Sequence, residues 1–190
     1  MITPVLKYIA EEINSHYDET VEEFVKLGNI ARLESSSGTS GADLQSKVIL
    51  TVVNIDEEKT LKNSPHYIKQ GDTLQKRNPT LFLNLYMLAS CAVDDYETAL
   101  TNISRVISFF QQKYVFTPEN AVASFPSGHV EKIILDLFSL NFEQVNHLWG
   151  ILGGKYQPSV LYKLRLIQIQ ESPLKDVSAI QEIKATENII

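Results

Sequence analysis

The segment GILGGKY, residues 150–156, superficially resembles a phosphate-binding P-loop. In a P-loop a glycine would stand at the position of Trp149, and a Ser or Thr that reaches magnesium would stand at that of Tyr156. A predicted helix precedes the segment and a predicted strand follows it, the reverse of the P-loop order. We therefore interpret Gly153 and Gly154 as the end of a helix, not as a nucleotide site.

The histidines and the single cysteine also lack the spacing of a catalytic or metal site. His16, His66, His129 and His147 are scattered, with no pair four residues apart around a glutamate. Ser127 and His129 lie close together in FPSGH, but a nucleophile elbow reads G-x-S-x-G. Cys91 lies in an apolar run and is expected to be a buried small hydrophobe. These residue types predict no metal and no cofactor.

Adjacent carboxylates occur at four places, and paired acids can perform acid-base chemistry. Neighbouring residues in a helix or strand point apart, however, so such pairs do not converge on one substrate. We expect solvated faces and a helix cap to account for them. The pairs are Glu11/Glu12, Glu22/Glu23, Glu57/Glu58 and Asp94/Asp95.

Composition excludes several classes of protein. The chain has 190 residues, 44% of them hydrophobic, and a net charge of -6, which is typical of one soluble globular unit. No apolar run reaches the roughly 18 residues of a membrane span, and acids at positions 11, 12, 18 and 19 interrupt any signal peptide. The acidic balance disfavours nucleic-acid binding. Without a signal peptide or membrane span, the chain is expected to stay in the cytoplasm after synthesis, and a single cysteine, which cannot form an internal disulfide, fits a reducing compartment.

Hydrophobic periodicity predicts three helices. The first begins at Thr3-Pro4 and ends near 14–17. The second follows a capping box of Asp94 and Glu97, with an apolar stripe at Tyr96, Leu100, Ile103, Ile107 and Phe110. The third follows a capping box of Asn141 and Gln144, with an apolar face of Phe142, Val145, Leu148 and Trp149.

The remaining apolar segments predict strands at 21–33, 48–55, 81–93, 114–118, 129–140 and 160–170. VILTVVNI (48–55) is apolar on both faces and indicates a central strand covered on both sides. In 160–170, Lys163 and Arg165 alternate with apolar residues, as on a half-exposed strand. Residues 35–43 are a Ser/Gly-rich loop, and 56–79 is a long polar loop without a periodic pattern.

This succession favours an α+β fold, with an antiparallel or mixed β-sheet flanked by helices. A doubly wound parallel sheet would require a helix between 55 and 80, where the pattern shows none. We expect one domain at 1–170, followed by a C-terminal extension at 171–190 that forms an edge element or an arm.

Taken as a set, five stretches resemble the cap, or tail-terminator, family of extracellular contractile injection systems, phage-tail-like particles such as the antifeeding prophage and the virulence cassettes. The resemblance covers about residues 1–170. The stretches are VKLGNIA (25–31), VVNIDEEKTLKN (52–63), NPTLFLNLYML (78–88), ISFFQQKYVFTPEN (107–120) and LNFEQVNHLWGILGGKYQPSVLYKLRLIQIQ (140–170).

The resemblance implies a tail-terminator-like fold and a non-enzymatic role. Such a protein forms a ring, expected to be a homohexamer, on the distal end of the inner tube and sheath and ends their polymerisation. Its partners would be other copies of itself, the inner-tube protein and the sheath protein, within a particle that is released or anchored, and without direct membrane insertion.

Charged residues in the long loop and near the last predicted strand are our candidates for the contacts of this ring, because charges of both signs set register between partners. They are Glu57, Glu58, Lys59, Lys62, Lys155, Lys163 and Arg165. Two alternatives stay open. One is an assembly adaptor or chaperone for tube or sheath subunits, and the other is a small hydrolase that uses Cys91, or Ser127 with His129.

Overall fold

The structure is a computed structural model of the chain. It describes residues 2–17, 23–32, 47–59, 67–70, 73–76, 81–126, 130–153, 155–169 and 175–177.

A six-stranded sheet with the order β1-β2-β5-β8-β7-β6 forms the body of the protein. β1 pairs in parallel with β2, and the other neighbours are antiparallel, so the sheet is mixed as expected. Three long strands lie in its middle, because VILTVVNI, LFLNLYML and VLYKLRLI supply apolar side chains along most of their length. The strands are β1 (Val25–Leu27), β2 (Val48–Glu57), β5 (Leu81–Cys91), β8 (Ser159–Ile169), β7 (Ile133–Leu137) and β6 (Val115–Phe116).

Two strand predictions need correction. The predicted strand at 21–33 is strand only at β1, because the chain turns into a short 3₁₀ helix, η1 (Ile30–Arg32), two residues after it. β2 is covered on both faces only from Val48 to Thr51, and its outer half is exposed or half-exposed. A bulge next to Val52 shifts its register against β5 at the point where the cover ends.

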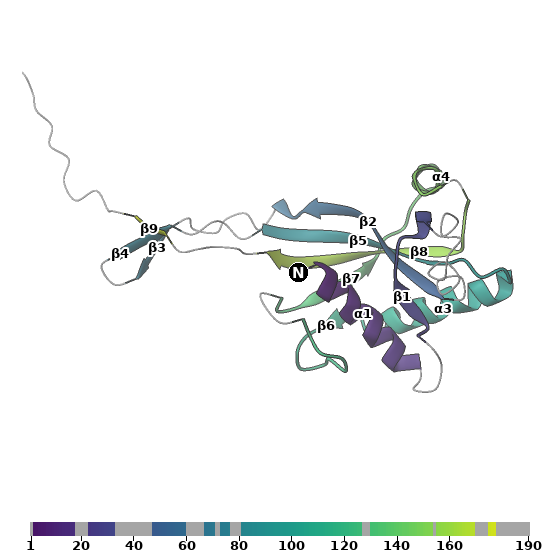
Figure 1. The fold of residues 1–190 in the computed structure, drawn as a ribbon, viewed down its shortest axis with the longest axis horizontal. Coiled ribbons are helices and arrows are strands. Elements are labelled where there is room, and N and C mark those ends of the chain that lie inside the picture. Colours follow the sequence, from purple (N-terminus) through teal and green to yellow (C-terminus); the bar gives the residue numbers. More distant parts are fainter. Residues whose placement is uncertain are drawn as a thin grey trace, which may run out of the picture.

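The expected loop at 56–79 is also wrong in part. β2 continues to Glu57, and β3 (Tyr67–Gln70) and β4 (Thr73–Lys76) form a hairpin within the segment. β9 (Lys175–Val177) pairs with β4 and completes a small three-stranded sheet. Figure 1 shows this small sheet beyond the ends of β2, β5 and β8.

One face of the large sheet is covered by α1 (Ile2–Tyr17) and α3 (Tyr96–Gln112). The N-cap of α3 is Asp95, not Asp94, and its carboxylate accepts a hydrogen bond from the Thr98 backbone N–H at 3.0 Å. The buried side of α3 also differs from the predicted stripe. Its buried residues are Ala99, Asn102, Ile103, Val106, Phe109 and Phe110, whereas Tyr96, Leu100 and Ile107 are exposed.

The opposite face carries α4 (Phe142–Ile151), which Figure 1 places across the sheet from α1 and α3. Its predicted capping box is confirmed, because Asn141 and Gln144 each accept a hydrogen bond from the other's backbone N–H. The helix ends as the glycines predict, since Gly153 has a φ of 117°, a conformation that side chains with a Cβ rarely adopt. Trp149 is the buried residue of α4, whereas Phe142, expected on the apolar face, is 96% exposed.

The described residues form two separate hydrophobic clusters, one on each face of the large sheet. The cluster under α1 and α3 contains 25 buried residues, including Phe116, Leu85 and Tyr162. The cluster under α4 and η1 contains five, centred on Trp149. Within the described part of the chain, every helix is too short or too polar to cross a bilayer.

Candidate assembly interface

The structure places the predicted interface residues in three regions. Glu57 ends β2, and Glu58 and Lys59 follow it. Lys163 and Arg165 lie in the middle of β8, and Lys155 follows α4. Lys62 lies outside the described residues, as do His66, Ser127, His129 and the loop 35–43.

Lys163 and Arg165 belong to a charged strip that crosses the sheet on the α4 side. Residues directly opposite in an antiparallel pair share a face, and Lys163 lies opposite both Tyr86 of β5 and Asp136 of β7. The Lys163 ammonium lies 5.8 Å from the centroid of the Tyr86 ring, within cation–π range. Arg165 Nε lies 2.5 Å from Asp136 Oδ2. Both groups are about half exposed, so this ion pair stabilises the fold by less than about 1 kcal/mol and remains within reach of a partner.

Glu58 is held in place by hydrogen bonds to β5. Its backbone N–H donates to the Phe82 carbonyl at 2.8 Å, and its carboxylate accepts a hydrogen bond from the Asn84 side chain at 3.0 Å. Asn84 faces Asp56 across the β2–β5 pair, on the side that carries the charged strip. The structure therefore brings Glu58 near Asp56, and both acids lie on the same side of the sheet as Lys163 and Arg165.

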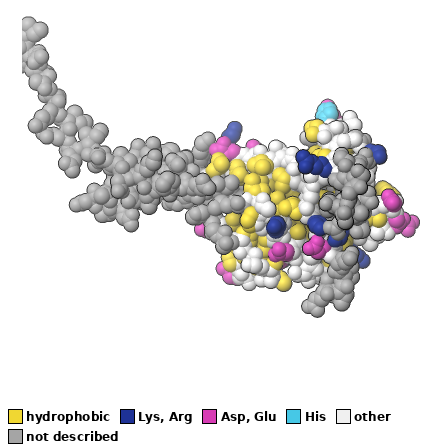
Figure 2. All heavy atoms as spheres, in the orientation of Figure 1, with side chains coloured by type: hydrophobic (Ala, Val, Ile, Leu, Met, Phe, Trp, Pro, Cys, Tyr) yellow, Lys and Arg dark blue, Asp and Glu magenta, His cyan; other side chains and the backbone are white. Residues whose placement is uncertain are grey.

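The other side of the same sheet end is apolar. Leu83 lies opposite Glu57 and next to Ile55 and Leu81, which are 49% and 39% exposed. Figure 2 shows a hydrophobic area on this part of the molecule, with acidic and basic side chains at its margin. An apolar centre with a polar rim is the usual anatomy of a protein interface. The sequence reasoning selected charged residues and did not single out these apolar ones.

A second apolar surface lies between α4 and the ends of β7 and β8. It forms a groove of about 650 Å³, which we call the α4 groove. Several of its aromatic and aliphatic side chains are exposed, most of all Phe142, Tyr156 and Leu137. The residues that define it here are Leu137, Phe138, Phe142, Val145, Trp149 and Tyr156.

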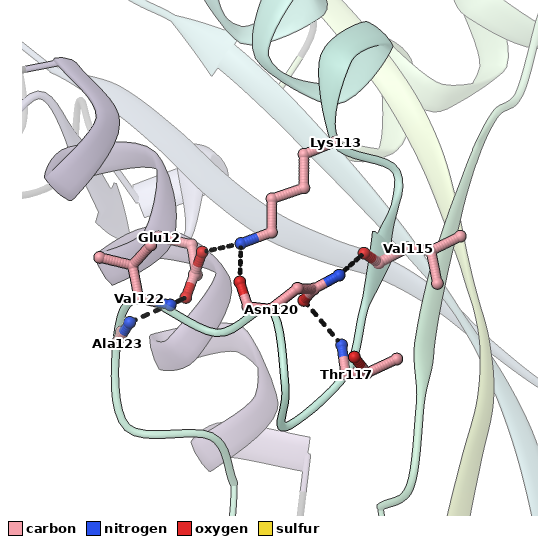
Figure 3. A network of polar contacts seen from close by, with 7 residues as sticks. All are labelled: Glu12, Lys113, Val115, Thr117, Asn120, Val122 and Ala123. Carbon is pink, nitrogen blue, oxygen red and sulfur yellow. Dashed lines mark hydrogen bonds and ion pairs between the residues drawn. The ribbon is translucent and has the colours of Figure 1, made fainter.

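Glu12 is a buried carboxylate at the centre of a network of polar contacts (Figure 3). Its carboxylate accepts hydrogen bonds from the backbone N–H groups of Val122 and Ala123, at 2.6 and 2.8 Å, and pairs with the Lys113 ammonium at 2.6 Å. Burial raises the pKa of Glu12, but the bonds from Lys113, Ala123 and Val122 outweigh burial and hold this pKa below its ordinary value.

Lys113 also donates to the Asn120 carbonyl at 2.7 Å, and the Asn120 side chain bonds to Thr117 N–H and the Val115 carbonyl. The network ties the turn at 117–123 to α1. The prediction that the Glu11/Glu12 pair is solvated is therefore wrong for Glu12, which is 2% exposed. The signal was present in the sequence, because Glu12 follows Val5 by seven residues and shares its helix face.

The described residues contain no group of three or more side chains that could hold a metal ion. Cys91 is fully buried, as predicted, and accepts a long contact of 3.7 Å from the Asn102 amide.

The comparisons with known proteins agree with the family resemblance seen in the sequence. A family model described as the Pvc16 N-terminal domain matches residues 4–181. No curated protein matches the chain.

Two solved structures share the fold. One is the PVC sheath/tube terminator in the extended state, from an extracellular contractile injection system, with a TM-score of 0.60 and 13% identity over 100% of this chain and 65% of that one. The other is the tube-terminating cap of the anti-feeding prophage, with a TM-score of 0.59 and 12% identity over 96% of this chain and 60% of that one. This chain therefore spans about two thirds of the length of these structures or less.

Proposed function

Because this chain belongs to the Pvc16 N-terminal domain family, we propose that it is a structural cap of a contractile injection system, which ends the polymerisation of the inner tube and sheath. One observation carries the proposal: the fold matches a sheath/tube terminator over the whole of this chain. The role is non-enzymatic and requires no cofactor. The partners are the tube protein, the sheath protein and further copies of the chain, within an assembled particle.

The physical logic of termination favours a ring. A polymer built from identical head-to-tail contacts grows until its exposed face is occupied by something that offers no new one. A cap must therefore bind through one side and close on itself, and a homohexameric ring meets both needs. The outer end of the large sheet suits this asymmetry, because it is apolar on the side of Ile55 and Leu81 and charged on the side of Lys163 and Arg165.

We assign the contacts with tube, sheath or neighbouring subunits to the charged residues at this end and near α4. Their charges of both signs set register and speed association more than they add affinity. The residues are Glu57, Glu58, Lys59, Lys62, Lys155, Lys163 and Arg165.

The direct test is assembly of particles with and without this chain. We expect its loss to give tubes of uncontrolled length, and its presence to give particles of one length with the chain at one end, as seen by electron microscopy. An assembly adaptor or chaperone would instead be absent from purified particles. A full complement of normal-length particles assembled without this chain would overturn the proposal.

Charge reversal tests the interface assignment. The double variant Glu57→Lys with Lys59→Glu keeps the net charge, and we expect it to lower the yield of capped particles while thermal unfolding stays unchanged. The matched control is Glu131→Lys with Lys132→Glu, an exposed acid next to an exposed base. Equal yields for both double variants would remove Glu57 and Lys59 from the interface.

A further inference from the structure

The apolar surface at the outer end of the large sheet has no cover among the described residues. Ile55 and Leu81 lie on the same side of the sheet as α1 and α3, yet both remain exposed. Leu83 lies between them and the core, and Ile167 and Ile169 of β8 occupy the register positions opposite Leu83 and Leu81. We call this surface, defined by Ile55, Leu81 and Leu83, the outer apolar face (Figure 2). Single chains rarely expose a continuous apolar patch that has no function.

One segment outside the described residues has the composition of an apolar cover. Residues 178–190, with the sequence SAIQEIKATENII, contain four isoleucines. No other stretch outside the described residues contains more than two large apolar residues. The segment follows β9 directly, and Figure 1 places β9 beyond the end of the large sheet at which the outer apolar face lies. It therefore begins at the correct end of the molecule. Its isoleucines are Ile180, Ile183, Ile189 and Ile190.

The register of the small sheet limits the distance that this segment must span. Val177 lies opposite Leu74, which precedes Leu81 by seven residues. Val177 therefore lies within about 30 Å of Leu81, counting seven extended residues and one strand spacing. Because the chain reaches about 40 Å between Val177 and Ile189, both Ile189 and Ile190 can lie on the outer apolar face. Ile180, three residues after Val177, reaches only about 10 Å, which is no more than the length of β9.

The same arithmetic excludes the α4 groove of the same chain as the site that the segment covers. Ser159 of the groove begins β8 and Ile169 ends it, so the groove lies about 33 Å farther along the sheet than the outer end. That distance and the length of β9 together use the whole reach of about 43 Å of a thirteen-residue segment. The outer apolar face is therefore the nearer of the two apolar surfaces and lies within reach.

We propose that residues 187–190 fold back over the outer apolar face of their own chain, with Ile189 and Ile190 against Ile55 and Leu81, and that a partner subunit displaces them when it binds there. The displacement rests on the proposed cap function, whereas the cover does not. The cover protects the free chain from non-specific association through its apolar surface. It also lowers the apparent affinity for the partner, because only uncovered chains are competent to bind.

Cysteine cross-linking in the full chain tests the cover. The double variant Leu81→Cys with Ile190→Cys, treated at low protein concentration with a short bismaleimide, should give an intramolecular link that mass spectrometry detects after proteolysis. Native Cys91 is fully buried and so protected from the reagent. The matched control is Leu137→Cys with Ile190→Cys, because Leu137 is also exposed but belongs to the α4 groove. A link at Leu81 that is no stronger than the link at Leu137 overturns the cover.

Serine variants give an independent readout of the cover. Ile189→Ser with Ile190→Ser should uncover the outer apolar face and raise the binding of the dye anilinonaphthalene sulfonate several-fold, while thermal unfolding stays unchanged. Ile180→Ser makes the same change in the same segment, but too near Val177 to reach the face, and should leave dye binding as in the wild type. Equal dye binding by all three proteins overturns the cover.

Particle assembly separates the cover from the cap function. The serine double variant should bind assembled tube more tightly by up to about ten-fold, the factor expected when about nine chains in ten are covered. In chains at a tube end, the link between Leu81→Cys and Ile190→Cys should no longer form, and a link that persists there overturns the displacement. A chain that caps tubes but shows no link when free overturns the cover and leaves the cap function standing. A chain that shows the link but never occupies a tube end overturns the cap function and supports the cover.

Discussion

The two faces of the large sheet differ in how much apolar surface their helices bury. Under α1 and α3, 25 of the described residues form one buried cluster that includes Phe116, Leu85 and Tyr162. The Glu12 network lies at the edge of this cluster. Under α4, five residues are buried and most side chains of the helix face outward. The first face therefore supplies the stability of the fold, while the second leaves a groove and a charged strip available for contacts. The following variants test whether the face under α1 and α3 supplies most of the stability and the α4 face little of it.

The largest effect is expected for Glu12→Ala. The change leaves the Val122 and Ala123 N–H groups without their acceptor and removes the carboxylate partner of the Lys113 ammonium, and breaking a buried pair in this way typically costs about 3–5 kcal/mol. Chemical denaturation measures the loss. Glu11→Ala, the exposed neighbour, is the matched control and should change the unfolding free energy by less than about 0.5 kcal/mol. Similar losses for the two variants would show that the network does not stabilise this face.

Trp149→Ala should come next, with an unfolding free energy lower by about 3 kcal/mol. Because Trp149 is the buried anchor of α4, the change should expose α4 amides to hydrogen exchange while those of α3 stay protected. Phe142→Ala, in the same helix but 96% exposed, should leave both unchanged. Equal loss of protection in α3 and α4 would mean that the two faces unfold as one unit and that the division is wrong.

The Glu12 network also predicts a pH dependence. The pKa of Glu12 in the folded chain lies below its ordinary value of 4.5, so the carboxylate stabilises the fold fully above that value and loses its contribution as pH falls through the folded pKa. Glu12→Gln does not titrate. The difference in melting temperature between wild type and this variant should therefore narrow below about pH 4.5. A constant difference down to pH 3 would contradict the assignment.

The smallest effect is expected at the start of α4. Asn141→Ala removes the side-chain acceptor of the Gln144 N–H and should lower stability by about 1 kcal/mol. The loss should be confined to hydrogen exchange in the first turn of α4. Asn146→Ala, an exposed asparagine within the same helix, is the control and should not destabilise the chain, because alanine favours a helix interior. Destabilisation by both variants alike would rule out the cap as the cause.

Sequence patterns predicted the elements whose signals are local. The capping box at Asn141 and the helix end at Gly153 depend on residues within one turn of each other, and both are confirmed. The long strands β2 and β5 were found because each is a largely apolar run longer than a turn can hold, and β8 was found because apolar and charged residues alternate along it. The hairpin of β3 and β4 was missed, because strand pairing is made by backbone groups and needs no apolar alternation.

The candidate site was predicted less well than the fold. The charged residues of β8 are where alternation placed them, but their pairing with Asp136 and Tyr86 depends on which strands lie beside β8. Leu100 and Ile107 were placed on the apolar stripe but are partly exposed, because such a stripe does not say which part of its arc meets the sheet. Adjacent Phe109 and Phe110 widened that arc, and packing turned both toward the sheet.

By itself the amino-acid sequence determined the fold class, the type of most elements and the absence of a catalytic motif, because these follow from hydrophobic period, caps and residue spacing. Tertiary structure alone decided which faces are buried, that Glu12 is an internal ion-pair partner, and that a groove remains beside α4. The physical reason is that burial depends on neighbours far away in the chain. A residue's type limits where it can lie, but only packing selects the surfaces that are left exposed to bind other subunits.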